Sequence, residues 1–154
     1  MLIMLKTGLL AIAMLASTMA LAADKKVVAP PGPAGPARPF SPALLVGDTL
    51  YVSGMVGRDA SGKRPENFEE EVKATLDGIG EHLKAGGASF ADVVSVQVYL
   101  TDMTLFERMN KIYVPFFPEP RPTRTTVGVA KLVGDYRIEI TVTARVDPKK
   151  AKKK

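Results

Sequence analysis

The chain of 154 residues has no cysteine, no tryptophan and a single histidine, His82. Without cysteine there can be neither a disulfide bond nor a thiol nucleophile. One histidine supports neither a histidine-based metal site nor the usual Ser-His-Asp triad. A phosphate-binding loop is also missing, because Gly54-Met55-Val56-Gly57 lacks the required lysine. We interpret His82 as a surface residue or one near a helix end rather than as a catalytic residue.

Charge is absent from residues 7–22, which are mostly apolar and follow Lys6. The run ends in Ala20-Leu21-Ala22, so it has the three regions of a secretory signal peptide, including a small-residue cleavage site. It is shorter than the ~20 residues that a membrane span needs. We therefore expect residues 1–22 to be a signal peptide cleaved after Ala22, and the protein to be periplasmic or secreted, with no membrane span after cleavage.

The net charge of +5 comes from the two ends of the chain. Without Lys6 and the five lysines of residues 148–154, the chain has 15 basic and 16 acidic residues. A nearly neutral domain lacks the basic face typical of nucleic-acid binding, so we expect no specific nucleic-acid partner. The lysine-rich tail could contact nucleic acid or anionic lipid, but a solvated terminus is the simpler interpretation.

Proline and glycine are frequent in residues 23–39 and predict an extended leader outside any helix or strand ladder. One domain is expected to follow over 40–147. Hydrophobic periodicity predicts the order ββαβαββ for this domain. The predicted strands cover 43–46, 49–53, 94–100, 125–132 and 137–146, and the last two are joined by a turn at Gly134-Asp135.

Two capping boxes mark the predicted helices. Asn67 and Glu70 begin the first helix, which ends at Gly86-Gly87, and Thr104 and Glu107 begin the second, which ends at a run of prolines. We expect an α+β fold in which both helices pack on one face of a mixed sheet. The other face would then be polar and β-branched, suited to contact with another subunit, and would carry Thr126, Gly128, Glu139, Thr141 and Thr143.

Two charged residues are candidates for chemistry. Arg124 opens a predicted strand after Pro122-Thr123, and its guanidinium could hold a substrate carboxylate bidentately; the alternative is an ordinary surface ion pair. Glu139 lies in the middle of the last strand and could move protons; the alternative is a structural partner for an arginine. If the last two strands form a hairpin, these residues lie roughly 17 Å apart along the ladder. We therefore expect Arg124 of one subunit to work with Glu139 of a neighbour, or Glu139 to act through intervening groups.

A series of short motifs follows one another along residues 39–146. They are Phe40-Ser41-Pro42-Ala43, Tyr51-Val52-Ser53-Gly54, Tyr99-Leu100-Thr101-Asp102-Met103, Met109-Asn110 with Tyr113 and Phe116-Phe117, Pro122-Thr123-Arg124-Thr125-Thr126-Val127, and Ile138-Glu139-Ile140. In this order they resemble the signature of the RidA-like (YjgF) family of reactive intermediate deaminases. The resemblance implies a chorismate-mutase-like fold and a homotrimer with sites between subunits.

The resemblance also implies an activity, which is hydrolysis of small 2-imino or 2-enamino acids, such as 2-aminoacrylate, to 2-oxo acids and ammonia without metal or organic cofactor. Arg124 matches the family's carboxylate-binding arginine and Glu139 the glutamate associated with the hydrolytic water, while Asn110 and Gly54 match residues that line the cleft.

Two substrate-binding positions depart from the family pattern. Phe40 stands where tyrosine is frequent, which removes a hydroxyl, and Thr126 stands where cysteine is frequent but could still offer its backbone N–H. The alternative function is a non-catalytic trimeric module that binds small carboxylates or a protein partner. A ribonuclease ranks last, because the domain is nearly neutral and has no histidine pair.

Overall fold

The computed structural model describes residues 24–32 and 39–147, so the predicted signal peptide and the predicted lysine-rich tail lie outside the described residues. The helices and strands follow one another as β1 (Lys25–Val28), β2 (Ala43–Val46), β3 (Thr49–Met55), α1 (Phe68–Ala85), β4 (Val93–Leu100), α2 (Phe106–Tyr113), β5 (Thr123–Gly128) and β6 (Ile138–Arg145). Within these ranges, no helix has the length and apolar character needed to span a bilayer.

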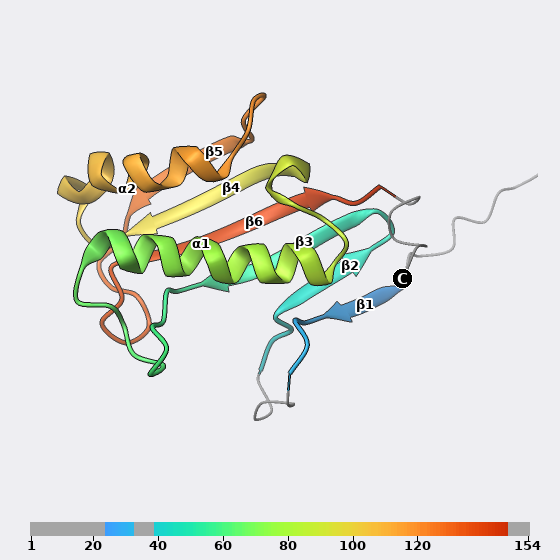
Figure 1. Ribbon diagram of the computed structural model, residues 1–154, viewed down its shortest axis with the longest axis horizontal. Coiled ribbons are helices and arrows are strands. Elements are labelled where there is room, and N and C mark those ends of the chain that lie inside the picture. Colours follow the sequence, from blue (N-terminus) through green and yellow to red (C-terminus); the bar gives the residue numbers. More distant parts are fainter. Residues whose placement is uncertain (1–23, 33–38, 148–154) are drawn as a thin grey trace, which may run out of the picture.

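The strands form one six-stranded sheet in the order β1-β2-β3-β6-β4-β5. The β4–β5 pair is parallel and the other neighbours are antiparallel. Both helices cover the same face of this sheet, and none of the described residues forms a helix over the opposite face (Figure 1). The prediction of an α+β fold with a mixed sheet and two helices on one face is therefore confirmed.

The core lies between the sheet and α1. Alternate residues of the three central strands are buried on the helix side, among them Leu50, Val98 and Ile140, and they pack in one cluster with Leu76 and Ile79 of α1. As predicted, Asn67 caps α1 by accepting a hydrogen bond from the Glu70 N–H at 3.0 Å. The helix ends at Gly86, and Gly87 follows with a φ of +80° that favours glycine.

The predicted pairing of the last two strands is wrong. The chain does turn at Gly134, where φ is +66°, but β6 then runs between β3 and β4 instead of pairing with β5. A central place gives β6 hydrogen-bonded neighbours on both edges and buries Ile138, Ile140 and Val142 under the helices. β5 becomes an edge strand that is parallel to β4. Local turn signals could not reveal this choice, because the alternative partners are distant in sequence.

This topology also corrects the predicted open face, meaning the sheet face without helices. Thr126 pairs with Val98, and Gly128 pairs with Leu100, so both lie on the helix side of the sheet. Glu139, Thr141 and Thr143 alternate with buried neighbours and do lie on the open face, as predicted. Tyr51, Tyr99 and Val127 share the open face with them.

The N-terminal segment differs from the prediction of an extended leader. Lys25–Val28 forms β1, which pairs with Ala43–Val46 of β2 in an antiparallel ladder. These four residues precede the first proline of the segment, Pro30, and end in two β-branched valines. The exposed Lys25 and Lys26 suit the edge of a sheet, where charge opposes pairing with other chains.

Two local predictions also fail. The alternation of apolar residues along 94–100 predicts that Val94 shares one apolar face with Val96 and Val98. Val94 is instead 45% exposed, because an irregularity between Val93 and Ser95 shifts the register of β4 against β6. The second helical segment begins with Asp102, whose carboxylate accepts a hydrogen bond from the Thr104 N–H at 2.8 Å, and not with a Thr104 capping box. A short 3-10 turn over Met103–Leu105 then leads into α2.

Candidate functional site

Arg124 lies on β5 with its side chain on the helix side of the sheet, level with the buried Val96. Its Nη1 donates a hydrogen bond to Oδ1 of Asn110 at 2.9 Å. Its Cζ lies 4.7 Å from the ring centroid of Tyr113 and 5.5 Å from that of Phe106. Three residues of α2 therefore hold this half-buried guanidinium through an amide oxygen and two aromatic rings.

No carboxylate of the described ranges forms an ion pair with Arg124. Five other arginines do have such a partner: Arg64, Arg108, Arg121, Arg137 and Arg145. A guanidinium carries five N–H donors, and Asn110 occupies one of those of Arg124. Arg124 is therefore not the ordinary ion pair considered as its alternative role. The remaining N–H donors of Arg124 are available to an acid that comes from outside the described residues.

Two buried hydroxyls lie beside this guanidinium without a hydrogen-bond partner among the described residues, those of Tyr113 and Thr126. Thr126 stands two positions along β5 from Arg124 and on the same side of the sheet. Burial raises the pKa of the Tyr113 phenol, and the nearby charge of Arg124 opposes this rise. The phenol is therefore protonated at neutral pH.

Glu139 lies on β6 and faces the open side of the sheet, where it is half-buried. A methyl group on Gly54 would overlap the Glu139 carboxylate, so the lack of a side chain at Gly54 makes room for this acid. Glu139 forms no ion pair within the described part of the chain, and the role of structural partner for an arginine of the same chain does not apply.

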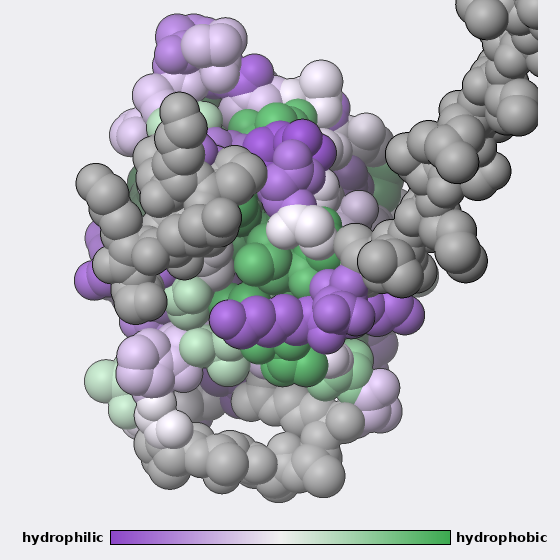
Figure 2. All heavy atoms as spheres, turned by 90° about the vertical axis from the view of Figure 1, so that its right-hand side faces the viewer, coloured by the Kyte–Doolittle hydropathy of each residue, from purple (hydrophilic) through white to green (hydrophobic). Residues whose placement is uncertain are grey.

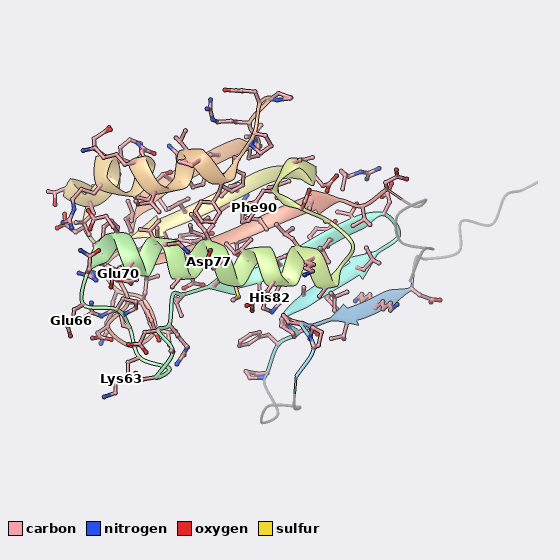
Figure 3. The ribbon with its side chains drawn as sticks, in the orientation of Figure 1. Lys63, Glu66, Glu70, Asp77, His82 and Phe90 are labelled. Atoms are coloured by element: carbon pink, nitrogen blue, oxygen red, sulfur yellow. The ribbon has the colours of Figure 1, made fainter. Side chains whose placement is uncertain are left out.

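Phe40 and Gly54 line one groove, which runs beside α1 and also contains Pro30, Met55 and His82. Phe40 is 55% exposed there, so its ring is available for contact with a ligand or another chain. Of the two positions predicted for His82, the one near a helix end is confirmed, because His82 lies in the last turn of α1 and not on the exposed surface. It is 9% exposed, and its Nδ1 lies 2.8 Å from the carbonyl oxygen of Gly78 in the preceding turn of α1. Figure 3 shows His82 on the side of α1 that is turned toward β2 and away from α2.

The predicted residues therefore form two separate groups within one chain. Arg124, Asn110 and Thr126 gather between β5 and α2, whereas Glu139 and Gly54 meet across β6 and β3. Arg124 lies level with Val96 and Glu139 lies level with Tyr99, on opposite faces of the sheet. About 10 Å along β4 and about 10 Å across two strand spacings place the two Cα atoms roughly 14 Å apart.

The separation was expected, although the hairpin used to estimate it was wrong. One group can bind a carboxylate and the other can accept or donate a proton, but a single chain cannot present both to one small molecule. Sequence reasoning missed Phe106 as a contact of Arg124, and it noted Tyr113 only as part of a motif. Their spacing with Asn110 in α2 could have indicated it, because residues four and seven positions apart share one side of a helix.

Comparisons with known proteins agree with the fold that carries these two groups. The family model described as endoribonuclease L-PSP matches residues 32–146. The 2-iminobutanoate/2-iminopropanoate deaminase of Bos taurus is 41% identical over 112 residues, which are 71% of this chain and 82% of that protein. A crystal structure of a putative endoribonuclease from Thermotoga maritima is 35% identical, has a TM-score of 0.72, and is matched over 80% of this chain and 99% of its own.

A further structure, RidA from an Antarctic Psychrobacter, is 33% identical with a TM-score of 0.69, and the match covers 74% of this chain and 93% of that one. The match to the family model extends over β2 to β6 and includes every residue of the two groups.

Proposed function

Because the chain belongs to the RidA/YjgF family, which the endoribonuclease L-PSP model describes, we propose that it hydrolyses small 2-imino and 2-enamino acids to 2-oxo acids and ammonia. The observation that carries the proposal is the state of Arg124. Its guanidinium is half-buried, held by Asn110, and has no acidic partner among the described residues. An arginine in this state suits a small external carboxylate, which it can bind through parallel hydrogen bonds.

The chemistry needs one acid–base group besides Arg124. A 2-enamino acid first takes a proton at C3 and becomes the imine. Water then adds to C2 of the imine, and Glu139 accepts the proton that the water loses. Glu139 then returns this proton to the nitrogen, the C–N bond breaks and ammonia leaves. The hydroxyl on C2 gives its proton to Glu139 as the carbonyl of the 2-oxo acid forms. Such proton transfer typically contributes a factor of about 10² to 10⁴ in rate.

Arg124 and Glu139 of one chain lie on opposite faces of the sheet, so the proposed site draws Arg124 from one copy and Glu139 from a neighbour. The open face suits such an assembly. Neither α1 nor α2, the two α-helices of the described ranges, covers it, and it exposes Tyr51 (49%) and Val127 (40%). Among the closed symmetries, a homotrimer is the arrangement implied by the family resemblance, with equivalent sites at its subunit contacts. Viewed from one end of the sheet, apolar surface also appears between hydrophilic residues (Figure 2).

RNA cleavage is not the proposed activity, despite the name of the family model. The chain has one histidine, and its buried His82 bonds within α1.

The test is an assay in which an amino-acid oxidase generates the imine and release of the 2-oxo acid is followed. We expect the full chain to accelerate the release, and Arg124→Ala to lower kcat/KM about 100-fold, because charge-assisted hydrogen bonds to the carboxylate are lost. Arg121→Ala is the matched control, since Arg121 lies three residues away, pairs with Glu119 and should leave the rate unchanged. Equal rates for wild type and Arg124→Ala would overturn the proposal and favour a non-catalytic binding module.

A further inference from the structure

Tyr113 is a buried residue of α2 that the proposed reaction does not yet use. Its side chain is 3% exposed, and its ring stacks on Phe117 with centroids 4.4 Å apart and planes 28° from parallel. A tyrosine in such a place usually finds a partner for its hydroxyl. Here the hydroxyl has none among the described residues, so hydrogen bonding within the core does not explain why the ring of Tyr113 lies over Arg124 of β5.

The ring of Tyr113 lies closer to the Arg124 guanidinium than any other aromatic ring does in the described ranges. The distance from Cζ to the ring centroid is 4.7 Å, against 5.5 Å for Phe106. Both distances fall within the range of a cation–π interaction, and a half-buried cation gains more from such contact than one in water. The Asn110 oxygen at 2.9 Å fixes one end of the guanidinium, and the two rings restrict its remaining freedom.

The Arg124 guanidinium is thus oriented by an amide oxygen and two aromatic rings, without an acidic partner among the described residues. An acidic partner would neutralise Arg124 and compete with a substrate carboxylate, whereas an aromatic face attracts the cation and leaves its N–H donors free. Two other arginines near aromatic rings differ from Arg124. Arg58 lies 5.5 Å from the Tyr136 ring, but it is exposed and donates to the carbonyl oxygen of Gly62 at 3.1 Å. Arg108 has the Phe68 ring centroid 5.5 Å away, but two of its three guanidinium nitrogens, Nε and Nη2, donate to Glu69. Arg124 combines aromatic contact with the absence of an acid among the described residues.

We propose that Tyr113 is a positioning residue, whose ring holds the Arg124 guanidinium in the orientation that receives the substrate carboxylate. The inference rests on the proposed function for the nature of the ligand, but it concerns the affinity of the site and not the chemical step. Tyr113 therefore acts on substrate binding through Arg124, and Glu139 is unaffected by it.

Three variants test this role by their KM and kcat. Tyr113→Leu removes the ring and should raise KM about tenfold with little change in kcat. Tyr113→Phe keeps the ring and removes only the unpartnered hydroxyl, so it should restore the wild-type KM without loss of thermal stability. Phe117→Leu is the matched control, because Phe117 is equally buried, stacks on Tyr113 and does not contact Arg124. It should lower the melting temperature as Tyr113→Leu does and leave KM unchanged.

A second measurement does not depend on activity. The Nε–H resonance of Arg124, assigned by its loss in Arg124→Lys, should carry a ring-current shift that Tyr113→Leu abolishes and Tyr113→Phe retains. An inactive wild type with this pattern would overturn the deaminase and keep Tyr113 as the positioning residue. An active wild type in which Tyr113→Leu has the wild-type KM, or in which Phe117→Leu raises KM equally, would overturn the role of Tyr113 alone.

Discussion

Gly54 and Glu139 meet on the open side of the sheet at the point where β3 departs from regular pairing with β6, between Val52 and Met55. The carboxylate occupies the volume that a side chain at Gly54 would need. The Glu139 carboxylate can therefore occupy this position only because Gly54 has no Cβ atom. This pairing could not be inferred from sequence position, because 85 residues separate the two along the chain.

We expect Gly54→Ala to lower kcat at least tenfold, because the new methyl group must displace the Glu139 carboxylate by more than the ~1 Å that already impairs catalysis. The melting temperature should change little, because the half-buried carboxylate can turn toward solvent. Steady-state kinetics of the imine assay and a thermal melt measure both. Gly32→Ala is the control, because Gly32 lines the same groove as Phe40 and Gly54 and its added methyl group would meet nothing within 4 Å. A Gly54→Ala variant with wild-type kcat would contradict the assignment of Glu139.

At the scale of residues, the sequence identified Arg124, Asn110, Thr126, Gly54 and Glu139 through motifs, and the structure shows the contacts that give the first two a common place. The hydroxyl of Thr126 is buried without a hydrogen-bond partner among the described residues. The presence of threonine where the family often has cysteine could not indicate this. Phe106 was missed as a contact of Arg124, because an apolar residue in an amphipathic helix is ordinarily expected to face the core, although its helical spacing with Asn110 pointed to a shared side.

At the scale of elements, a bidentate ion pair joins α1 and α2. Arg108 of α2 donates to both oxygens of Glu69 in the first turn of α1, at 2.7 and 2.8 Å. This pair lowers the pKa of Glu69 from 4.5 to about 2. Because α2 carries Asn110 and Tyr113, the pair also helps to set where the helix holds Arg124.

The lowered pKa predicts a pH dependence of stability. The folded chain binds fewer protons at Glu69 than the unfolded chain does, so this contribution is fully present above pH 4.5 and is lost as the pH falls toward 2. We expect Glu69→Gln to remove this part of the acid destabilisation. Urea unfolding between pH 2 and 6 measures it, and Glu70→Gln serves as control, because Glu70 uses its backbone N–H in the helix cap. Parallel pH profiles for wild type and Glu69→Gln would contradict the role of the pair.

Elements that depend on local signals were predicted well. The apolar spacing and the caps located α1 to within a residue, and alternation located β6. Pairing was less predictable, because the choice between a β5–β6 hairpin and a central β6 depends on contacts between distant segments. β1 was missed because the prolines and glycines that follow it dominate the composition of its segment.

At the scale of the whole molecule, the proposed sites need two copies of the chain, and this can be tested by mixing. Arg124→Ala and Glu139→Gln should each be nearly inactive alone. When the two are unfolded together and refolded as mixed trimers, about a quarter of the subunit contacts combine an intact Arg124 with an intact Glu139. We therefore expect about a quarter of the wild-type rate in the imine assay.

The control is each variant refolded by itself, which should stay inactive. Light scattering of the refolded samples establishes whether trimers have formed. Mixed trimers without recovered activity would contradict sites shared between subunits, as would a monomeric wild-type chain with full activity.

The place of β4 between β5 and β6 has one more consequence. It keeps Arg124 and Glu139 on opposite faces of the hydrogen-bonded sheet. We therefore expect a newly made chain to be inactive until it assembles with other copies. The rate per milligram should then fall steeply on dilution below the association threshold and return on reconcentration. Abundance, and not only folding, would govern when this protein works.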